Sequence, residues 1–231
     1  MTRILMLLLP CTALYALSGG SPAAAQDPGR VNVFGAGSFL AAERAFSVDD
    51  NDDFFRTTYQ TGGKVGFRYT ADLNEFWAGE AGYSLGRNSL RVTDLDQPNT
   101  FSIFEINVHQ FSANALYYFN PPAEDLRPFV TFGLGVTRFS PTDDAQANAA
   151  QNLFGEPAVI NGSTKFGVNF GGGVENRMSD RMGMRFDVRD HLMAIPRYGL
   201  PEMEPSSGSF YPVDGSVHNF ELGVGIVFYL R

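Results

Sequence analysis

Residues 219–230 read Asn-Phe-Glu-Leu-Gly-Val-Gly-Ile-Val-Phe-Tyr-Leu, a run in which every second residue is a large apolar one. The apolar set is Phe220, Leu222, Val224, Ile226, Phe228 and Leu230. Successive side chains of a β-strand point to opposite faces of its sheet, whereas a helix repeats every 3.6 residues. The stretch therefore predicts a strand with one continuous apolar face.

The same period of two recurs along the chain and predicts an all-β fold of eight strands. The other strands are predicted around residues 31–40, 65–69, 77–83, 113–119, 131–137, 165–175 and 184–189. The first of these is rich in glycine, and its inward face stays undecided. No segment after the first 25 residues has the ~20 apolar residues of a membrane-spanning helix or the stripe of a long amphipathic one.

The first 25 residues have the pattern of a secretory signal peptide. Arg3 is followed by apolar runs and then by Ala23–Ala25, a small-residue cleavage site. We therefore expect a signal peptide at 1–25 and one domain at 26–231. Cys11 is the only cysteine, and Pro10 beside it disfavours a lipoprotein anchor. The predicted mature chain has no thiol for a disulfide, a metal site or a nucleophile.

Composition narrows the class of partner. The chain of 231 residues has 17 Lys and Arg against 25 Asp and Glu, a net charge of -8. Binding to a phosphate backbone needs a cationic surface, so nucleic acid is not an expected partner. A hydrophobic content of 44%, of which many residues are aromatic, also excludes a disordered chain.

The connections between the predicted strands alternate in length. The long ones span 41–58, 87–102, 140–163 and 192–216, and the short ones 71–75, 120–127 and 179–181. Outer-membrane barrels have short periplasmic turns and long external loops. The pattern predicts an eight-stranded antiparallel up-and-down transmembrane β-barrel in the cell outer membrane, with both termini periplasmic.

The two faces of the predicted strands differ in polarity, and this difference indicates which face contacts lipid. The apolar set suits lipid, and its large aromatic members near the short turns suit a membrane interface. These are Tyr69, Trp77, Tyr117, Phe119 and Phe228. The other set holds nine ionisable residues, namely Lys64, Arg68, Glu80, Lys165, Glu175, Arg185, Asp187, Arg189 and Glu221.

These nine residues are predicted to form a lumenal charge network. An eight-stranded barrel has an interior only wide enough for side chains, and an unpaired buried charge costs several kcal/mol. Five positive and four negative groups can coexist there only as pairs. We expect Glu175 to face Arg185 across the turn at 179–181, and Glu80 to face Lys64 or Arg68.

Several segments together resemble the outer-membrane protein β-barrel domain family, whose small members are barrels of the OmpA and OmpX type. They are Arg-Pro-Phe-Val-Thr-Phe-Gly-Leu-Gly at 127–135, the hairpin 169–190 with Gly-Gly-Gly-Val-Glu and Met-Arg-Phe-Asp-Val-Arg, and the closing strand. The resemblance implies a Gram-negative cell envelope, insertion by the barrel-assembly machinery, and contact with outer-membrane lipid and lipopolysaccharide. Such barrels usually finish on an aromatic residue, whereas this chain ends Tyr229-Leu230-Arg231. We expect a monomer.

The expected role is structural or one of surface interaction, without enzyme activity. A diffusion pore is disfavoured because an aqueous channel takes about 16 strands. A small ion conductance through the charged lumen stays an alternative. So does a lipid A-modifying enzyme, which would need a serine beside a base. The nearest set is Ser216, His218 and Glu221, but Ser216 and Glu221 fall on opposite faces, and the three histidines suit the rim. No catalytic residue is predicted.

Two long loops could bind something outside the cell. Asp49–Asp53 beside Phe54 and Phe55 is acidic but lacks the spacing of an EF-hand loop, so no metal site is predicted. The loop between Pro196 and Pro212 carries Tyr198 and Tyr211, which suit an external partner that the sequence does not identify. The Gly-x-Gly pairs lie within strands, so no nucleotide or other cofactor is expected.

Overall fold

The computed structural model describes residues 29–41, 43–47, 54–94, 101–152, 159–200 and 215–230. The predicted signal peptide, the acidic segment 49–53 and the loop residues 201–214 lie outside these ranges. The elements are β1 (Arg30–Ala41), β2 (Glu43–Ser47), β3 (Phe54–Asp72), β4 (Trp77–Asp94), β5 (Phe101–Tyr118), β6 (Leu126–Pro141), α2 (Asp143–Asn152), β7 (Ser163–Arg177), β8 (Met182–Ala194) and β9 (Ser216–Tyr229).

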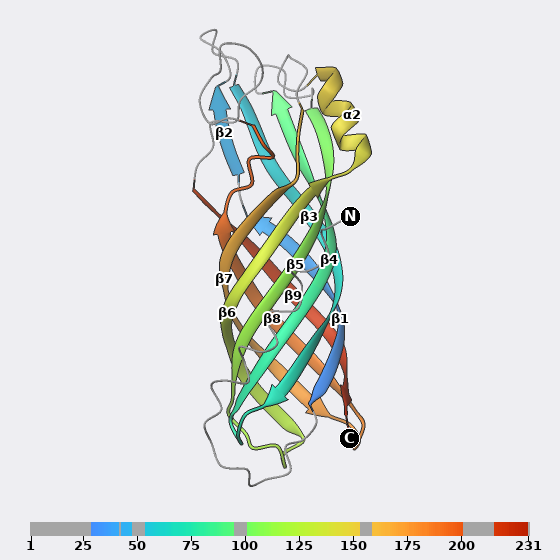
Figure 1. The fold of residues 1–231 in the computed structure, drawn as a ribbon, viewed down its shortest axis with the longest axis vertical. Coiled ribbons are helices and arrows are strands. Elements are labelled where there is room, and N and C mark those ends of the chain that lie inside the picture. Colours follow the sequence, from blue (N-terminus) through green and yellow to red (C-terminus); the bar gives the residue numbers. More distant parts are fainter. Residues whose placement is uncertain are drawn as a thin grey trace, which may run out of the picture.

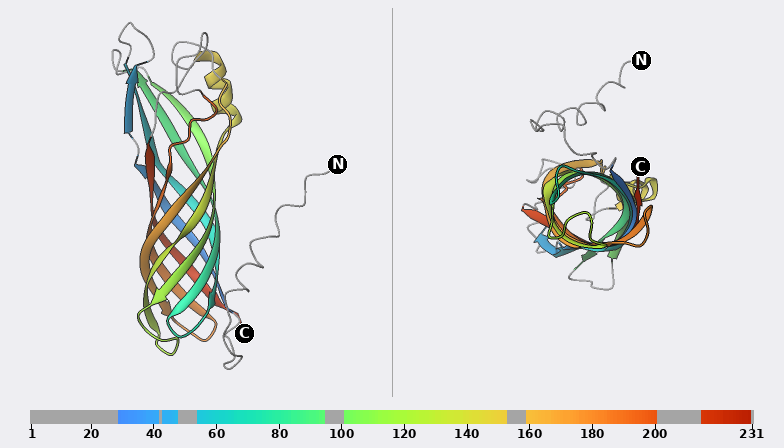
Figure 2. Two further views of the ribbon diagram at one scale, coloured as in Figure 1. Left: turned by 60° about the vertical axis from the view of Figure 1, so that its left-hand side comes forward. Right: turned by 90° about the horizontal axis from the view of Figure 1, so that it is seen from below.

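The strands form one closed antiparallel barrel. Each strand from β3 to β8 pairs with the next in sequence, and β1 pairs with both β9 and β3. The short strand β2 follows β1 and also pairs with β3. Because β1 and β2 together occupy one position in the barrel wall, the described strands form an eight-stranded barrel. Figure 2 shows the closed ring seen along its axis. The predicted fold is confirmed.

The short connections gather at one end of the barrel, here called the turn end, and the opposite end is called the loop end (Figure 1). Local hydrogen bonds shape the turns. The Asn74 side-chain oxygen accepts from the backbone N–H groups of Phe76 and Trp77 at 3.0 and 2.9 Å. The Ser179 hydroxyl accepts from the N–H of Met182 at 3.1 Å. Both belong to the turn chemistry of short polar side chains.

Three strands are long, and two of them, β3 and β4, extend into predicted connections; the polarity of their faces changes along their length. β3, β4 and β5 have 19, 18 and 18 residues, whereas about 9–11 span a membrane. Near the turn end Phe111 and Leu85 point outward and Glu80 inward. Near the loop end Phe104 and Ile106 point inward and are buried, while Glu105 is exposed. The inner face of these strands thus changes from polar to apolar towards the loop end.

An apolar core fills the loop end. Its buried members are Leu40, Tyr59, Leu90, Val92, Phe104, Ile106, Val108, Phe139, Ala145, Ala149, Ile160, Met193, Ile195, Tyr198 and Val217. A register shift in β3 between Gln60 and Gly63 helps to build it. Below the shift Val65 points outward, and above it Tyr59 turns inward. An inserted residue inverts the alternation of a strand in this way.

Helix α2 lies in the long connection between β6 and β7, where the sequence predicted only a loop of unspecified structure. Thr142 begins it, because its hydroxyl accepts from the N–H of Ala145 at 3.2 Å, and Asp143 and Asp144 favour its first turn. The buried face consists of Ala145 and Ala149, one helical turn apart. Alanine gives too weak an apolar stripe to signal a helix. No helix in the described ranges is long and apolar enough to cross a membrane.

Candidate functional site

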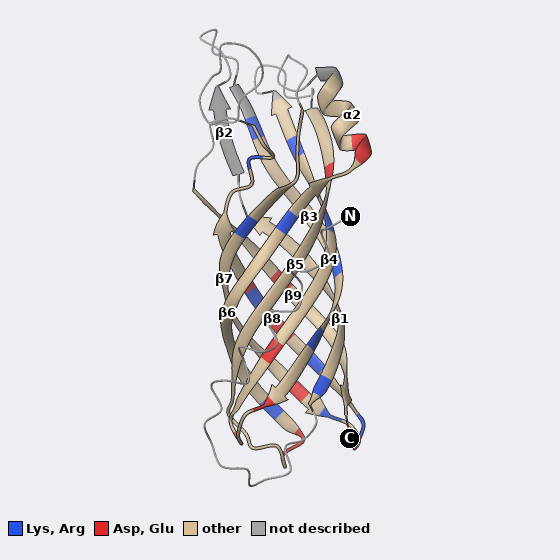
Figure 3. Cartoon of the chain, in the orientation of Figure 1, with Lys and Arg blue, Asp and Glu red and all other residues tan. Residues whose placement is uncertain are grey.

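The lumen between the turn end and the apolar core holds a chain of buried ion pairs. Eight of the nine residues predicted for it are inward and buried. They are Lys64, Arg68, Glu80, Glu175, Arg185, Asp187, Arg189 and Glu221. Figure 3 shows acidic and basic positions on several strands of the part of the barrel towards the turn end. The ninth, Lys165, is half-buried nearer the loop end, and the described residues offer it no ion pair.

Two arginines and two carboxylates occupy the middle of the lumen. Glu80 of β4 lies 2.8 Å from Nη1 of Arg185 and 2.8 Å from Nη2 of Arg189, both on β8. Asp187, between the two arginines on β8, lies 3.1 Å from Nε of Arg185 and 3.3 Å from Nε of Arg189. The guanidinium of Arg185 also stacks on Phe129, 4.2 Å from the ring centre. The side chains thus bridge opposite walls.

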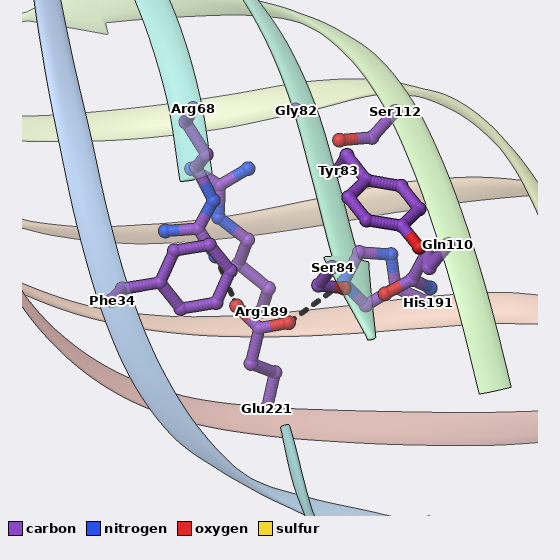
Figure 4. Close-up of a pocket in the computed structure, with 10 residues that line it drawn as sticks. All are labelled: Phe34, Arg68, Gly82, Tyr83, Ser84, Gln110, Ser112, Arg189, His191 and Glu221. Atoms are coloured by element: carbon purple, nitrogen blue, oxygen red, sulfur yellow. Dashed lines mark hydrogen bonds and ion pairs between the residues drawn. The ribbon is translucent and has the colours of Figure 1, made fainter. Parts of the chain in front are cut away.

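A second group extends this chain towards the loop end. Nζ of Lys64 donates to Glu221 at 2.8 Å and to Gln110 at 3.1 Å. Arg68 pairs with Glu221 and, at 2.8 Å, with Asp187. Figure 4 shows Arg68 and Glu221 meeting over the ring of Phe34, which lies 3.7 Å from the guanidinium carbon. Ion pairs therefore run without interruption from Lys64 to Glu80.

A third group closes the turn end. Arg30 lies 2.7 Å from Asp72 and 3.0 Å from Glu175. The hydroxyl groups of Tyr118 and Tyr229 each donate to Glu175 at 3.2 Å. These contacts join the first described strand to β3, β5, β7 and β9, so the side chains cross-link most of the barrel wall.

The individual pairs differ from those expected. Glu175 does stand opposite Arg185 in the β7–β8 register, but its ion pair is with Arg30, and Arg185 pairs with Glu80 and Asp187. Glu80 pairs with neither Lys64 nor Arg68. In a narrow barrel a long side chain reaches the far wall as easily as its neighbouring strand, so register alone does not select the partner.

Four ionisable residues lie in the lumen that were not predicted from the sequence. They are Arg30, Asp72, Arg127 and His191. Arg30 and Asp72 lie just outside the predicted strands. Arg127 lies two residues before the inward Phe129, and His191 lies two residues after the inward Arg189. Continuing the predicted strands by two residues would therefore have found both.

The space left inside the network is small. A cavity lined by Phe34, Arg68, Gln110, His191 and Glu221, among others, has a volume of about 10 Å³, enough for about one water molecule. His191 reaches Glu221 at 3.6 Å on its edge. The side chains therefore fill this section rather than line a channel.

The set Ser216, His218 and Glu221, weighed as a catalytic group, is not assembled. Glu221 points into the lumen, where Lys64 and Arg68 bind it. His218 lies on the outer face, and its Nδ1 is 2.7 Å from Oδ2 of Asp190 on β8. Its ring stacks on Phe220 with centres 5.8 Å apart. The outer face thus carries a carboxylate–imidazole pair that was not predicted from the sequence. Asp190 directly follows the inward residues Arg185, Asp187 and Arg189 and therefore points to the other face.

The other histidines divide between the two faces. His191 is buried in the lumen, so the expectation that all three lie at the rim was wrong for it. His109 is on the outer face of β5, with Nδ1 2.9 Å from the Tyr83 hydroxyl. Within the described ranges no three His, Cys, Asp or Glu side chains are placed to hold a metal ion.

The aromatic residues predicted for the membrane interface lie on the outer face near the turn end. Trp77 and Tyr117 pack edge to face with ring centres 5.1 Å apart, and Tyr117 packs on Phe119 at 5.4 Å. Tyr69 and Phe228 are exposed by 43% and 40%. Large aromatic side chains so exposed suit a bilayer interface.

Comparisons with known proteins agree with this architecture. A family model described as the outer membrane protein beta-barrel domain matches residues 11–228. OprG from Pseudomonas aeruginosa has a similar structure, with 12% identity, a TM-score of 0.57, and coverage of 88% of this chain and 96% of that one. AlkL in lipid bilayers gives 13%, 0.52, 92% and 95%, and Neisserial surface protein A gives 14%, 0.44, 87% and 97%. At these identities the likeness concerns the fold. No curated protein matches the chain.

Proposed function

Because the chain belongs to the outer membrane protein beta-barrel domain family, we propose that this outer-membrane barrel has a structural or surface-interaction role, closed to diffusion and extended beyond the bilayer. The observation that carries the proposal is the reversal of polarity along β4 and β5. Near the turn end these strands have a polar interior and an apolar exterior, whereas near the loop end their interior is apolar and their exterior carries Arg87, Arg91 and Glu105 beside the exposed Phe101 and Ile103.

The outer face supports a position for the bilayer. Its apolar band begins at Trp77, Tyr117 and Phe228 and ends at polar residues on the same strands. The polar residues are Arg87 on β4, His109 on β5 and His218 on β9. Each interval is about 9–11 residues, which is the length of a tilted transmembrane strand. The parts of β4 and β5 beyond this band then stand outside the bilayer.

The extension is built like a water-soluble barrel. Leu90, Phe104 and Phe139 are buried inside it, and Arg87 and Glu105 are 61% and 50% exposed on its outer side. An apolar core of this kind holds the strands rigid without lipid. Because its strands are already ordered, this extension would lose less conformational entropy when its surface or its loops bind a partner.

The filled lumen argues against the alternative of ion conduction. The ion pairs of Arg185, Arg189 and Glu80 span the section, and the cavity beside them has room for about one water molecule. An ion passing through would have to break buried pairs, which costs about 3–5 kcal/mol for each partner removed.

Cysteine labelling on intact cells tests the extension and its orientation. Since Cys11 is the only cysteine and lies in the predicted signal peptide, single introduced thiols report their own positions. Ser89→Cys should react with a membrane-impermeant maleimide on intact cells. Glu124→Cys, in the β5–β6 turn, should react only after the outer membrane is permeabilised, as periplasmic termini require.

Leu134→Cys is the matched control, because Leu134 is 67% exposed yet lies in the apolar band. It should stay unlabelled in both conditions. Labelling of Leu134→Cys on intact cells, or protection of Ser89→Cys there, would contradict the proposed position of the bilayer.

A second candidate function is a lipid A-modifying activity, which the Asp190–His218 pair favours. A carboxylate that binds Nδ1 leaves Nε2 of the imidazole as the base, the arrangement used in serine hydrolases. Ser216 lies on the same outer face, two residues away. Mass spectrometry of lipid A from cells with the wild-type protein or His218→Ala tests this candidate. Identical lipid A in both would remove it.

A further inference from the structure

We propose that the outer face of β5, β6 and β7 binds a phosphate group of the outer-leaflet glycolipid, with Arg138 as its central residue. The inference uses the barrel's membership of an outer-membrane family and goes beyond the role proposed above. Arg138 is exposed on β6 and stands opposite His109 on β5 and Thr164 on β7.

These three residues mark the edge of the apolar band. The next outward residues towards the turn end are apolar, namely Phe111 on β5, Val136 on β6 and Phe166 on β7. Phe111 and Phe166 are exposed by 49% and 79%. In a bilayer, the polar headgroups lie where such an apolar band ends. The guanidinium of Arg138 is therefore held at headgroup depth.

The charge of Arg138 has no counter-charge among the described residues. Its Nη1 donates to the Thr164 hydroxyl at 3.4 Å, a neutral partner. By contrast, Arg87 on the same face pairs with Glu105 at 3.3 Å, and Arg91 stacks over the ring of Phe101 at 4.3 Å. Arg138 thus keeps donor capacity that a second anion can use.

The neighbours of Arg138 can complete a site for phosphate. The Tyr83 hydroxyl and Nδ1 of His109 are 2.9 Å apart. When the hydroxyl donates, Nε2 of His109 carries the proton and can donate to an anion. A guanidinium binds phosphate through two parallel hydrogen bonds. Such bonds are stronger at a bilayer surface than in bulk water, because the dielectric constant there is lower.

The net charge of the chain argues for local binding. At -8 the whole molecule repels anions at long range. Retention of a phosphate must therefore depend on a few cations at short range, and the loss of one of them should have a large effect. The phosphorylated glycolipid of the outer leaflet is the anion that lies at this depth.

Native mass spectrometry of the full-length barrel in detergent tests the site. The probes are lipid A carrying its two phosphates, the same lipid after enzymatic removal of both, and inorganic phosphate. We expect Arg138→Gln to weaken binding of the phosphorylated lipid about tenfold, the equivalent of one charge-assisted hydrogen bond. The phosphate-free lipid should bind the wild type and the variant equally weakly.

Arg181→Gln is the matched control, since Arg181 is an exposed arginine in the turn at the other end of the barrel; it should bind like the wild type. Each of three results would overturn the proposal: unchanged binding to Arg138→Gln, equal wild-type binding of the phosphate-free lipid, or displacement of the lipid by equimolar inorganic phosphate. Migration of the unheated variant on a gel confirms that it is folded, and labelling of Ser89→Cys tests the bilayer position separately.

Discussion

Glu80 is the residue on which the middle of the lumen depends most. It is buried and lies 2.8 Å from both Arg185 and Arg189. Asp187 contacts the same two arginines but also binds Arg68. Without Glu80 three buried guanidinium groups would share Asp187 and Glu221. Buried cations without a carboxylate are costly, because protein offers them far less solvation than water.

We therefore expect Glu80→Gln to lower the free energy of unfolding by about 3–5 kcal/mol, the usual effect of breaking a buried pair. Urea unfolding in lipid vesicles, followed by the fluorescence of Trp77, measures the change. Glu105→Gln breaks the exposed pair with Arg87 and should change stability by less than about 1 kcal/mol. Equal effects of the two substitutions would contradict a structural role for the lumenal network.

The sequence could predict that Glu80 and Arg185 face inward, but it could not predict their contact. The face follows from a period of two, which needs only neighbouring residues. The partner depends on which side chains reach across the lumen between β4 and β8, and this is a property of the closed barrel. For the same reason Asp190 was not connected with His218. Asp190 stands opposite Phe220 and His218 opposite Leu192, so the pair crosses diagonally between the two strands.

At the scale of elements, β4 and β5 each combine two kinds of strand. The turn-end half has the alternation of a membrane barrel and the loop-end half that of a soluble one. With apolar residues assumed to point outward, the alternation of β5 was recognised only from Ala113 onward, although the strand begins at Phe101. The period of two continues through both halves, and only its assignment to the faces changes.

The loop-end half should respond to mutation separately. Phe139 is fully buried in the apolar core of this half, and Phe139→Ala should cost about 3–5 kcal/mol through the cavity that it leaves. We expect trypsin added to intact cells to cleave this variant at Arg87 or Arg91 while the wild type resists. Fragment sizes on a denaturing gel locate the cuts.

Phe132→Ala provides the comparison, because Phe132 is on the outer face, 55% exposed, within the apolar band. It should leave the loop-end half resistant to trypsin. Cleavage of both variants at the same sites would mean that the two halves do not differ in what stabilises them.

At the scale of the molecule, the closed hydrogen-bonded wall and the filled lumen predict how the purified protein behaves. In mild detergent the barrel should stay folded in an unheated gel sample and migrate differently after boiling. In planar bilayers it should give no conductance steps, since ion pairs span the lumen and the cavity beside them has room for about one water molecule. Regular ion-selective steps that change in Glu80→Gln would contradict the closed lumen.

The pairing of β1 with β9 has a consequence for biogenesis. Every other neighbour in the barrel follows directly along the chain, but this seam joins Arg30 to Tyr229 and Ala41 to His218. Contacts between residues so distant in sequence form slowly, because the intervening chain must first be ordered. Neighbouring strands can pair locally as hairpins, whereas the N-terminal strand must wait for the last one. A chaperone or insertase that shields these two unsatisfied strands would thus govern the final step of insertion.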